Sequence, residues 1–186
     1  MKLLHKLSII FILNFLFPFD GDTHDFFLPN GMKVIFMEKD LKQEVSIGVY
    51  YNIGSKYEQI GERGLNNILA DVYHNLRKEK YNKEDIETQR AKPYIKKDLT
   101  GFVNEIEKEN LYDALKIEAK LMKNFISEIN ENSIENSKNK IKQKIKDHNQ
   151  SYIAPISNLR RDILPKNHPY YHGVWGFEEE FVTLSF

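Results

Sequence analysis

Hydrophobic and polar positions along the chain follow a pattern that predicts a mixed α+β domain. Apolar residues at every second position over Val45 to Tyr51 are typical of a half-buried strand. Phe26 to Leu28 and Met32 to Met37 flank an Asn-Gly pair, which predicts a β-hairpin because this dipeptide accepts positive φ angles. One or two more strands are expected within Tyr94 to Ile106.

Apolar residues spaced three and four apart predict the helices. In chain order these are Leu65 to Arg77, a weaker polar helix within Lys78 to Gln89, Asn110 to Phe125, Glu131 to His148, and Ser157 to Leu164, which Pro165 ends. No repeat or low-complexity linker divides the chain. Its 186 residues therefore predict one ordinary α+β domain.

The first twenty residues have a different pattern, typical of targeting. Lys2, His5 and Lys6 precede a short apolar run from Leu7 to Phe19. Such a run fits a signal-peptide core better than a membrane span. We therefore predict a signal peptide or N-terminal anchor over residues 1–20 and a domain over residues 21–186. The protein is expected to be exported, as a periplasmic, envelope-associated or secreted protein; a buried N-terminal strand or helix is the alternative.

Composition excludes several classes of function. Lys plus Arg and Asp plus Glu both number 27, so no overall field favours nucleic acid. The lysine-rich stretch from Lys138 to Lys146 is interpreted as a solvated helix face, because no aromatic residues interleave it. The absence of cysteine excludes disulfides, thiolate catalysis and Cys-ligated metal sites.

A series of short motifs follows one order along the chain. The series consists of Asn30-Gly31 in the hairpin, Gly54-Ser55-Lys56 with Glu58, Gly64-Leu65 at a helix start, Thr100-Gly101-Phe102, and Leu164-Pro165 before His168-Pro169-Tyr170. This series resembles the insulinase/pitrilysin superfamily, which includes the mitochondrial processing peptidase. The resemblance implies one N-terminal-type domain of such a peptidase, with a largely antiparallel sheet and helices packed on one face.

Active members of that superfamily carry an H-x-x-E-H motif on the helix that follows Gly-Leu, in which two histidines bind zinc and the glutamate activates water. The resemblance places Asn67 and Asp71 at the histidine positions and Ala70 at the glutamate position. A third ligand, a glutamate from a later helix, falls near Lys144. All four positions are changed, so no zinc and no catalytic residue is expected.

Two hypotheses follow from these replacements. If Asp71 and Lys144 face each other, we predict an ion pair between them, with Asn67 nearby, because an isolated buried charge is costly. Alternatively, Asp71, His74 and His148 form a displaced metal site, since Asp71 and His74 share one helix face and His148 lies one turn beyond Lys144. That site would make the chain a zinc peptidase with non-standard ligands.

The peptide-binding edge of the resembled peptidases is also altered. Their Asn-Ala-x-Thr segment binds substrate by strand addition. Counting back from Asp98 places Lys92, Pro93, Tyr94 and Ile95 at this edge. Proline cannot donate to a ladder, so we expect a weakened peptide edge, or simply a blunted one.

The resemblance therefore predicts a non-catalytic homologue of a zinc peptidase, either an accessory subunit or a degenerate fragment. Its expected partner is an active metallopeptidase homologue or a second half-domain, as for silent members of the processing peptidase and of respiratory complex III. An unrelated exported envelope protein is the remaining alternative. We also expect an incomplete C-terminus whose apolar residues need a partner, another segment or a membrane to cover them: Phe177, Phe181, Val182, Leu184 and Phe186.

Overall fold

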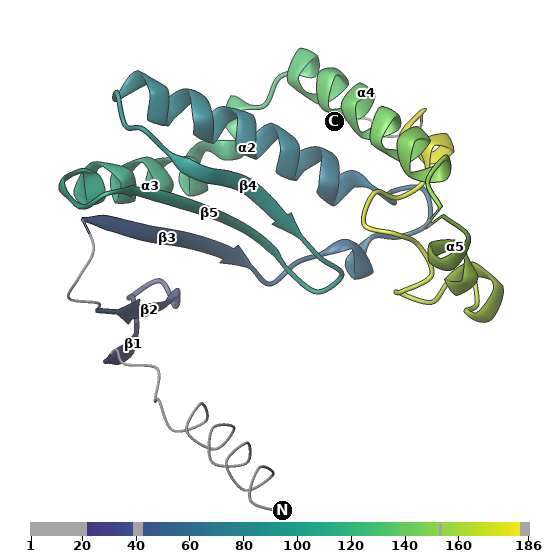
Figure 1. Ribbon diagram of the computed structural model, residues 1–186, viewed down its shortest axis with the longest axis horizontal. Helices are drawn as coiled ribbons and strands as arrows, with labels where there is room; N and C mark the ends of the chain where they lie inside the picture. Colours follow the sequence, from purple (N-terminus) through teal and green to yellow (C-terminus); the bar gives the residue numbers. More distant parts are fainter. Residues whose placement is uncertain (1–21, 39–42, 153, 183–186) are drawn as a thin grey trace, which may run out of the picture. The chain divides into compact units, whose positions relative to one another are not determined.

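The computed structural model describes residues 22–38, 43–152 and 154–182 (Figure 1). The chain divides into a small unit, Met1–Gln43, and a larger unit, Glu44–Phe186. The predicted targeting segment lies outside the described residues, as do Leu184 and Phe186. None of the helices in the described ranges has the length and apolar character needed to cross a membrane.

The small unit contains the predicted hairpin. Strand β1 (Thr23–Phe27) pairs antiparallel with β2 (Lys33–Met37). Gly31 has a φ of 83°, and the Asn30 side chain accepts a hydrogen bond from the Met32 N–H at 3.1 Å. Gly31 therefore supplies the positive φ of this turn, and Asn30 contributes its side chain rather than a positive φ.

The larger unit is built on a three-stranded antiparallel sheet with the order β3-β5-β4. Its strands are β3 (Glu44–Tyr51), β4 (Gln89–Ile95) and β5 (Thr100–Glu107). Helices α2 (Leu65–Lys83) and α3 (Leu111–Glu128) pack on one face of the sheet (Figure 1). Ile47, Phe102 and Ile106 point to these helices and are buried. The predicted α+β class and antiparallel sheet are confirmed.

A buried ion pair lies inside this apolar layer. Arg77 Nε of α2 donates to Glu118 Oε1 of α3 at 2.6 Å, and both side chains are almost fully buried. The same carboxylate oxygen accepts the Tyr81 hydroxyl at 2.7 Å, and Arg77 also donates to Asn104 of β5 at 3.0 Å. These polar contacts join both helices to the central strand.

The predicted separate helix within Lys78 to Gln89 is wrong. Helix α2 continues without a break to Lys83, and β4 begins at Gln89. Tyr81, with 0% of its surface exposed, anchors the last turn of α2 in the core. Asp85, with a φ of 56°, lies in the turn between α2 and β4. Because the buried Tyr81 holds the last turn of α2, the end of this helix depends on burial rather than on the polarity of the local sequence.

A second apolar cluster lies on the other side of α2. Ile68 and Val72 of α2 pack against Ile134 and Ile141 of α4 (Glu131–Asn149) and against Phe181. Phe181 is 1% exposed, because α2 and α4 cover it; of the expected kinds of cover, this residue has another segment of the chain. Helix α5 (Ala154–Ile163) and two 3₁₀ turns, η1 (Ser55–Tyr57) and η3 (Glu178–Val182), complete the unit together with η2 (Lys108–Asn110).

Candidate functional site

The first turns of α2 carry the residues that the resemblance places at the positions of a zinc motif. Asn67, Ala70 and Asp71 are all buried, with 2%, 4% and 3% of their surfaces exposed. Gly64 is the N-cap residue that precedes α2, and its positive φ of 99° suits glycine. An added Cβ there would lie 2.5 Å from the Phe181 ring, so a C-terminal residue closes tightly over the helix start.

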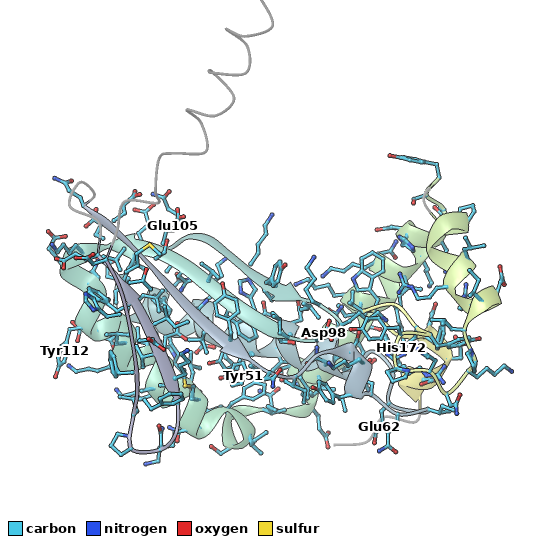
Figure 2. All side chains as sticks on the ribbon, turned by 90° about the horizontal axis from the view of Figure 1, so that it is seen from below. Tyr51, Glu62, Asp98, Glu105, Tyr112 and His172 are labelled. Carbon is cyan, nitrogen blue, oxygen red and sulfur yellow. The ribbon has the colours of Figure 1, made fainter. Side chains whose placement is uncertain are left out.

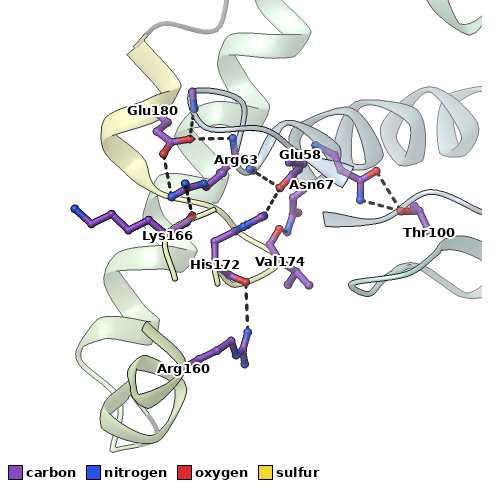
Figure 3. A network of polar contacts seen from close by, with 12 residues as sticks. Glu58, Arg63, Asn67, Thr100, Arg160, Lys166, His172, Val174 and Glu180 are labelled. Atoms are coloured by element: carbon purple, nitrogen blue, oxygen red, sulfur yellow. Dashed lines mark hydrogen bonds and ion pairs between the residues drawn. The ribbon is translucent and has the colours of Figure 1, made fainter. Parts of the chain in front are cut away.

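Glu58 supplies the acceptors that the start of α2 lacks. Its two carboxylate oxygens accept the N–H groups of Gly64 at 3.0 Å and Asn66 at 2.7 Å. A carboxylate at this end also complements the helix dipole. His172 Nε2 lies 2.9 Å from Glu58 Oε2, and both side chains are buried (Figure 3). Glu58 therefore joins the helix start to the C-terminal segment.

Asp71 forms the predicted kind of ion pair, but with a different lysine. Its carboxylate binds the Lys140 ammonium of α4 at 2.5 Å, the Ser137 hydroxyl at 3.0 Å and the Asn75 amide at 3.3 Å. Within the described part of the chain Asp71 makes no ion pair with Lys144, so the predicted partner is wrong. Lys140 lies one helical turn before Lys144, and the packing of Ile134 and Ile141 sets which turn of α4 faces Asp71.

Asn67 and Ala70 are engaged in different surroundings. The Asn67 amide donates to the Val174 carbonyl at 3.2 Å, so its polar group binds the C-terminal segment (Figure 3). Ala70 packs in the core beside Tyr73 and lines an apolar cavity of about 240 Å³ bounded by α2, α3 and the sheet. A methyl group at this position has no atom that accepts a proton from water.

The alternative metal ligands are not brought together. No three His, Asp or Glu side chains among the residues that the structure describes are placed to share a metal ion. His74 is half-buried, and burial lowers its pKa more than the nearby Asp71 raises it. The His148 ring instead packs edge-on against Trp175, with ring centres 4.8 Å apart. Asp71 and His74 thus lie near each other on α2, whereas the ring contact of His148 is with Trp175.

The predicted peptide edge is an outer strand of the sheet. Lys92, Pro93, Tyr94 and Ile95 form the end of β4, which among the described strands pairs with β5 alone, in the order β3-β5-β4. Lys96 N–H donates to the Leu99 carbonyl at 2.9 Å, so hydrogen-bonded pairs alternate from this turn backwards. Pro93, opposite Phe102, falls in a non-hydrogen-bonded pair. Its missing donor therefore affects the outward edge and leaves the β4–β5 ladder intact.

Polar residues that the sequence did not single out connect the loop before α2 to the C-terminal segment. Glu180 Oε2 accepts the N–H groups of Gly61 at 2.8 Å and Arg63 at 3.1 Å, and the Arg63 guanidinium lies 3.5 Å from Glu180 Oε1 (Figure 3). The carbon of the same guanidinium lies 5.4 Å from the ring centre of Tyr171 and 5.1 Å from that of Phe177. Residues 168–181 are rich in aromatic and acidic residues, and this composition was the sequence signal that could have identified the segment as part of the site.

The turn between β4 and β5 is tied to the same segment. The Tyr170 hydroxyl donates to Asp98 Oδ1 at 2.6 Å, and the Lys56 ammonium reaches that oxygen at 2.7 Å. Figure 2 labels Asp98 and His172, which belong to the two segments that meet here. The motif helix, the peptide edge and the C-terminal segment thus form one connected region.

Comparisons with known proteins show the fold. Neither family models nor curated protein sequences give a match. Among solved structures, a protease from Helicobacter pylori superposes with a TM-score of 0.74 and 15% identity, over 89% of this chain. The periplasmic protease PqqL from Escherichia coli gives 0.72 and 16% over 90%. The fold is that of a domain of pitrilysin-like proteases.

A third solved structure extends this likeness beyond proteases. A chain of complex III2 from Candida albicans, bound to Inz-5, superposes with a TM-score of 0.69 and 12% identity over 88% of this chain. This chain spans 41% of the Helicobacter protein, 37% of the complex III2 chain and 20% of PqqL. The likeness therefore concerns one domain of each larger protein.

Proposed function

We propose that this chain is a non-catalytic relative of pitrilysin-like proteases that acts as an accessory subunit. The observation that carries the proposal is the Asp71 carboxylate, which binds Lys140 and Ser137 of α4 inside the chain. In an active peptidase of this fold, the resemblance would place zinc between the corresponding helices. In this chain the Lys140 ammonium binds the Asp71 carboxylate, and its positive charge repels a divalent cation at this position.

The remaining motif positions support the same proposal. The Asn67 amide donates its hydrogen bond to the Val174 carbonyl, and a neutral amide is a poor zinc ligand. Ala70 offers no general base, a contribution typically worth about 10²–10⁴-fold in rate. Binding of zinc and activation of water would thus both be weak for reasons internal to the site.

An accessory role in an assembly fits the structural likeness. One similar structure is a chain of complex III2, which is an assembly. We infer that the partner here is an active peptidase of the same fold. Export is part of the proposal, because residues 1–20 have a targeting pattern and the similar PqqL is periplasmic. Mass spectrometry of the N-terminus from fractionated cells checks this point.

Zinc binding and peptide cleavage test the loss of catalysis. The full chain is dialysed against zinc and compared with a variant that carries Asn67→His, Ala70→Glu, Asp71→His and Lys140→Glu. We expect no stoichiometric zinc in the parent chain and zinc uptake in the variant, because three ligands then face one another. Stoichiometric zinc in the parent chain, lost on changing His74→Asn, would contradict the proposal.

A mixing experiment tests the accessory role. The full chain is combined with an intact peptidase homologue from the same source, and complex formation is followed by analytical ultracentrifugation while peptide cleavage is measured. We expect a defined complex whose cleavage rate or specificity differs from that of the peptidase alone. No complex at any ratio of the two proteins would refute the accessory role but leave the zinc result unaffected.

A further inference from the structure

A cavity separate from the motif helix lies between the β4–β5 turn, helix α5 and the C-terminal segment. Its volume is about 470 Å³. Lys96 and Lys97 of the turn, and Arg160 and Arg161 of α5, contribute to its wall. Cavities of about 300–1,000 Å³ are the usual size of small-molecule sites. Neither Asn67 nor Asp71 takes part in this wall.

The charges of the wall are predominantly positive. The four basic side chains face two acidic ones, Glu178 and Glu179. Glu178 is in addition 3.8 Å from the ammonium of Lys146, which lies outside the wall. Low-dielectric walls of one sign focus the field on a ligand of the opposite sign. The cavity is therefore suited to an anion.

Among the basic residues of the wall, Lys97 has a buried ammonium that an anion would stabilise. Its ammonium is buried and has no hydrogen-bond partner among the described residues. Two carboxylates act on it electrostatically, but Asp98 is bound by Lys56 and Tyr170, and Glu58 caps α2. Burial, assisted by the charge of Arg160, lowers the pKa of Lys97 to about 8. The Tyr170 ring centre lies 5.9 Å from this ammonium, but a ring accepts no conventional hydrogen bond. A buried ammonium that lacks hydrogen bonds is costly and is stabilised by an opposite charge.

Aromatic side chains form the apolar part of the wall. Tyr171, Trp175 and Phe177 also line the cavity. Arg161 also lies over the Phe177 ring, with 5.6 Å between the guanidinium carbon and the ring centre. Arginine has five N–H donors, and one from Arg160 binds the His172 carbonyl at 3.4 Å. The wall thus combines cationic donors with ring surfaces.

We propose that this cavity binds a small molecule that carries an anionic group and an apolar or aromatic group, with Lys97 as the charge partner. A carboxylate at the end of a short apolar peptide has this chemistry, as does an aromatic phosphate. The anion accepts hydrogen bonds from the cationic side, while the apolar group contacts the rings. This ligand site is independent of the proposed loss of zinc chemistry.

A matched pair of peptides tests the charge requirement. Binding of N-acetyl-alanyl-phenylalanine to the full chain is compared with binding of its C-terminal amide, and phenyl phosphate and inorganic phosphate distinguish the source of the anion. Trp175 is the only tryptophan of the sequence and lines the cavity, so its fluorescence reports occupancy directly. We expect the free acid to bind about 10- to 100-fold more tightly than the amide, as hydrogen bonds to charged groups imply.

Variants test whether Lys97 is the partner. Lys97→Met keeps the length of the side chain but removes the charge, and it should abolish the preference for the acid. Lys120→Met, an exposed lysine of α3, is the matched control and should bind as the parent does. If Lys97→Met does not fold, Arg161→Met should show the same loss in weaker form.

Several results would overturn the proposal. Equal affinity for the acid and the amide would remove the charge requirement. A preference for the acid that persists in both Lys97→Met and Arg161→Met would place the anion elsewhere. No fluorescence change and no calorimetric heat with any of the four probes would refute a ligand site in this cavity. Tighter binding of phenyl phosphate than of the peptide acid would support the site and assign it to phosphates.

Discussion

The contact between Asp71 and Lys140 can be measured by a double-mutant cycle. Asp71→Asn keeps the shape of the side chain and its hydrogen bonds to neutral donors, whereas Lys140→Met keeps the length of the lysine. The two single variants and the double variant are compared with the parent chain. The cycle isolates the coupling free energy between the two charges from the other effects of each substitution.

The expected coupling lies between that of a surface pair and that of a buried pair. The Asp71 side chain is 5% exposed and the Lys140 side chain 49% exposed, with 2.5 Å between the charged atoms. Exposed pairs contribute about 0.2–1 kcal/mol, and breaking a fully buried pair costs about 3–5 kcal/mol. Because only one partner is desolvated, we expect a coupling of roughly 1–3 kcal/mol.

Urea unfolding followed by circular dichroism gives the free energies of unfolding. Glu79 and Lys83 of the same helix provide a matched control, since they also lie 2.5 Å apart but are 53% and 64% exposed. Their coupling should be about 0.3–0.5 kcal/mol. A coupling between Asp71 and Lys140 that is no larger than that of the control pair would refute the interpretation that burial makes this contact strong.

Three further predictions concern the structure around the site, and each is measured as a change in the free energy of unfolding. Gly61→Ala and Gly64→Ala both impose a positive φ on alanine, which should cost about 1–2 kcal/mol of stability. The new methyl group of Gly64→Ala also clashes with Phe181, so this variant should cost roughly 1–3 kcal/mol more. Equal costs for the two variants would contradict the close packing at Gly64. Glu118→Gln leaves the buried charge of Arg77 without an opposite charge, so we expect a loss of stability of about 3–5 kcal/mol. Combining Arg77→Met with Glu118→Met should recover most of this loss. No recovery would contradict the assignment of the loss to an unpaired buried charge. Burial lowers the pKa of Lys97 to about 8 from its ordinary 10.5, so between these values the unfolded chain holds more protons and stability rises with pH. After discounting for solvent screening, this rise is roughly 1–2 kcal/mol and should be absent in Lys97→Met.

Local patterns predicted most of the strands and helices of the larger unit. The alternation over Val45 to Tyr51 and the Gly64-Leu65 helix start are found where expected, because burial on one face and a positive φ leave direct traces in sequence. The end of α2 was not predictable in this way. Its last turn is polar around Tyr81, and only the tertiary core shows that this single ring holds the turn in place.

The polar contacts of the site were only partly predictable. The cost of burying a lone carboxylate predicts a cationic partner for Asp71, and the resemblance, which sets α4 beside α2, predicts a lysine of α4. The choice of Lys140 over Lys144 depends on how far α4 slides along α2, a distance of one helical turn that apolar packing decides. The contact between Arg63 and Glu180 joins residues 117 positions apart, and no local pattern marks such a pair.

The C-terminal segment and α4 supply polar partners to the residues that the resemblance places at zinc-motif positions. In a metal site the ion satisfies several polar groups at once, so their replacement leaves buried groups that need other partners. Here Val174 accepts the Asn67 amide, while α4 supplies donors to Asp71. The same segment places Trp175 in the wall of the basic cavity. A variant that loosens this segment, such as Glu58→Gln through its contact with His172, should therefore weaken both the start of α2 and the binding of an anion. Loss of helix stability with unchanged anion affinity would show that the two regions are independent.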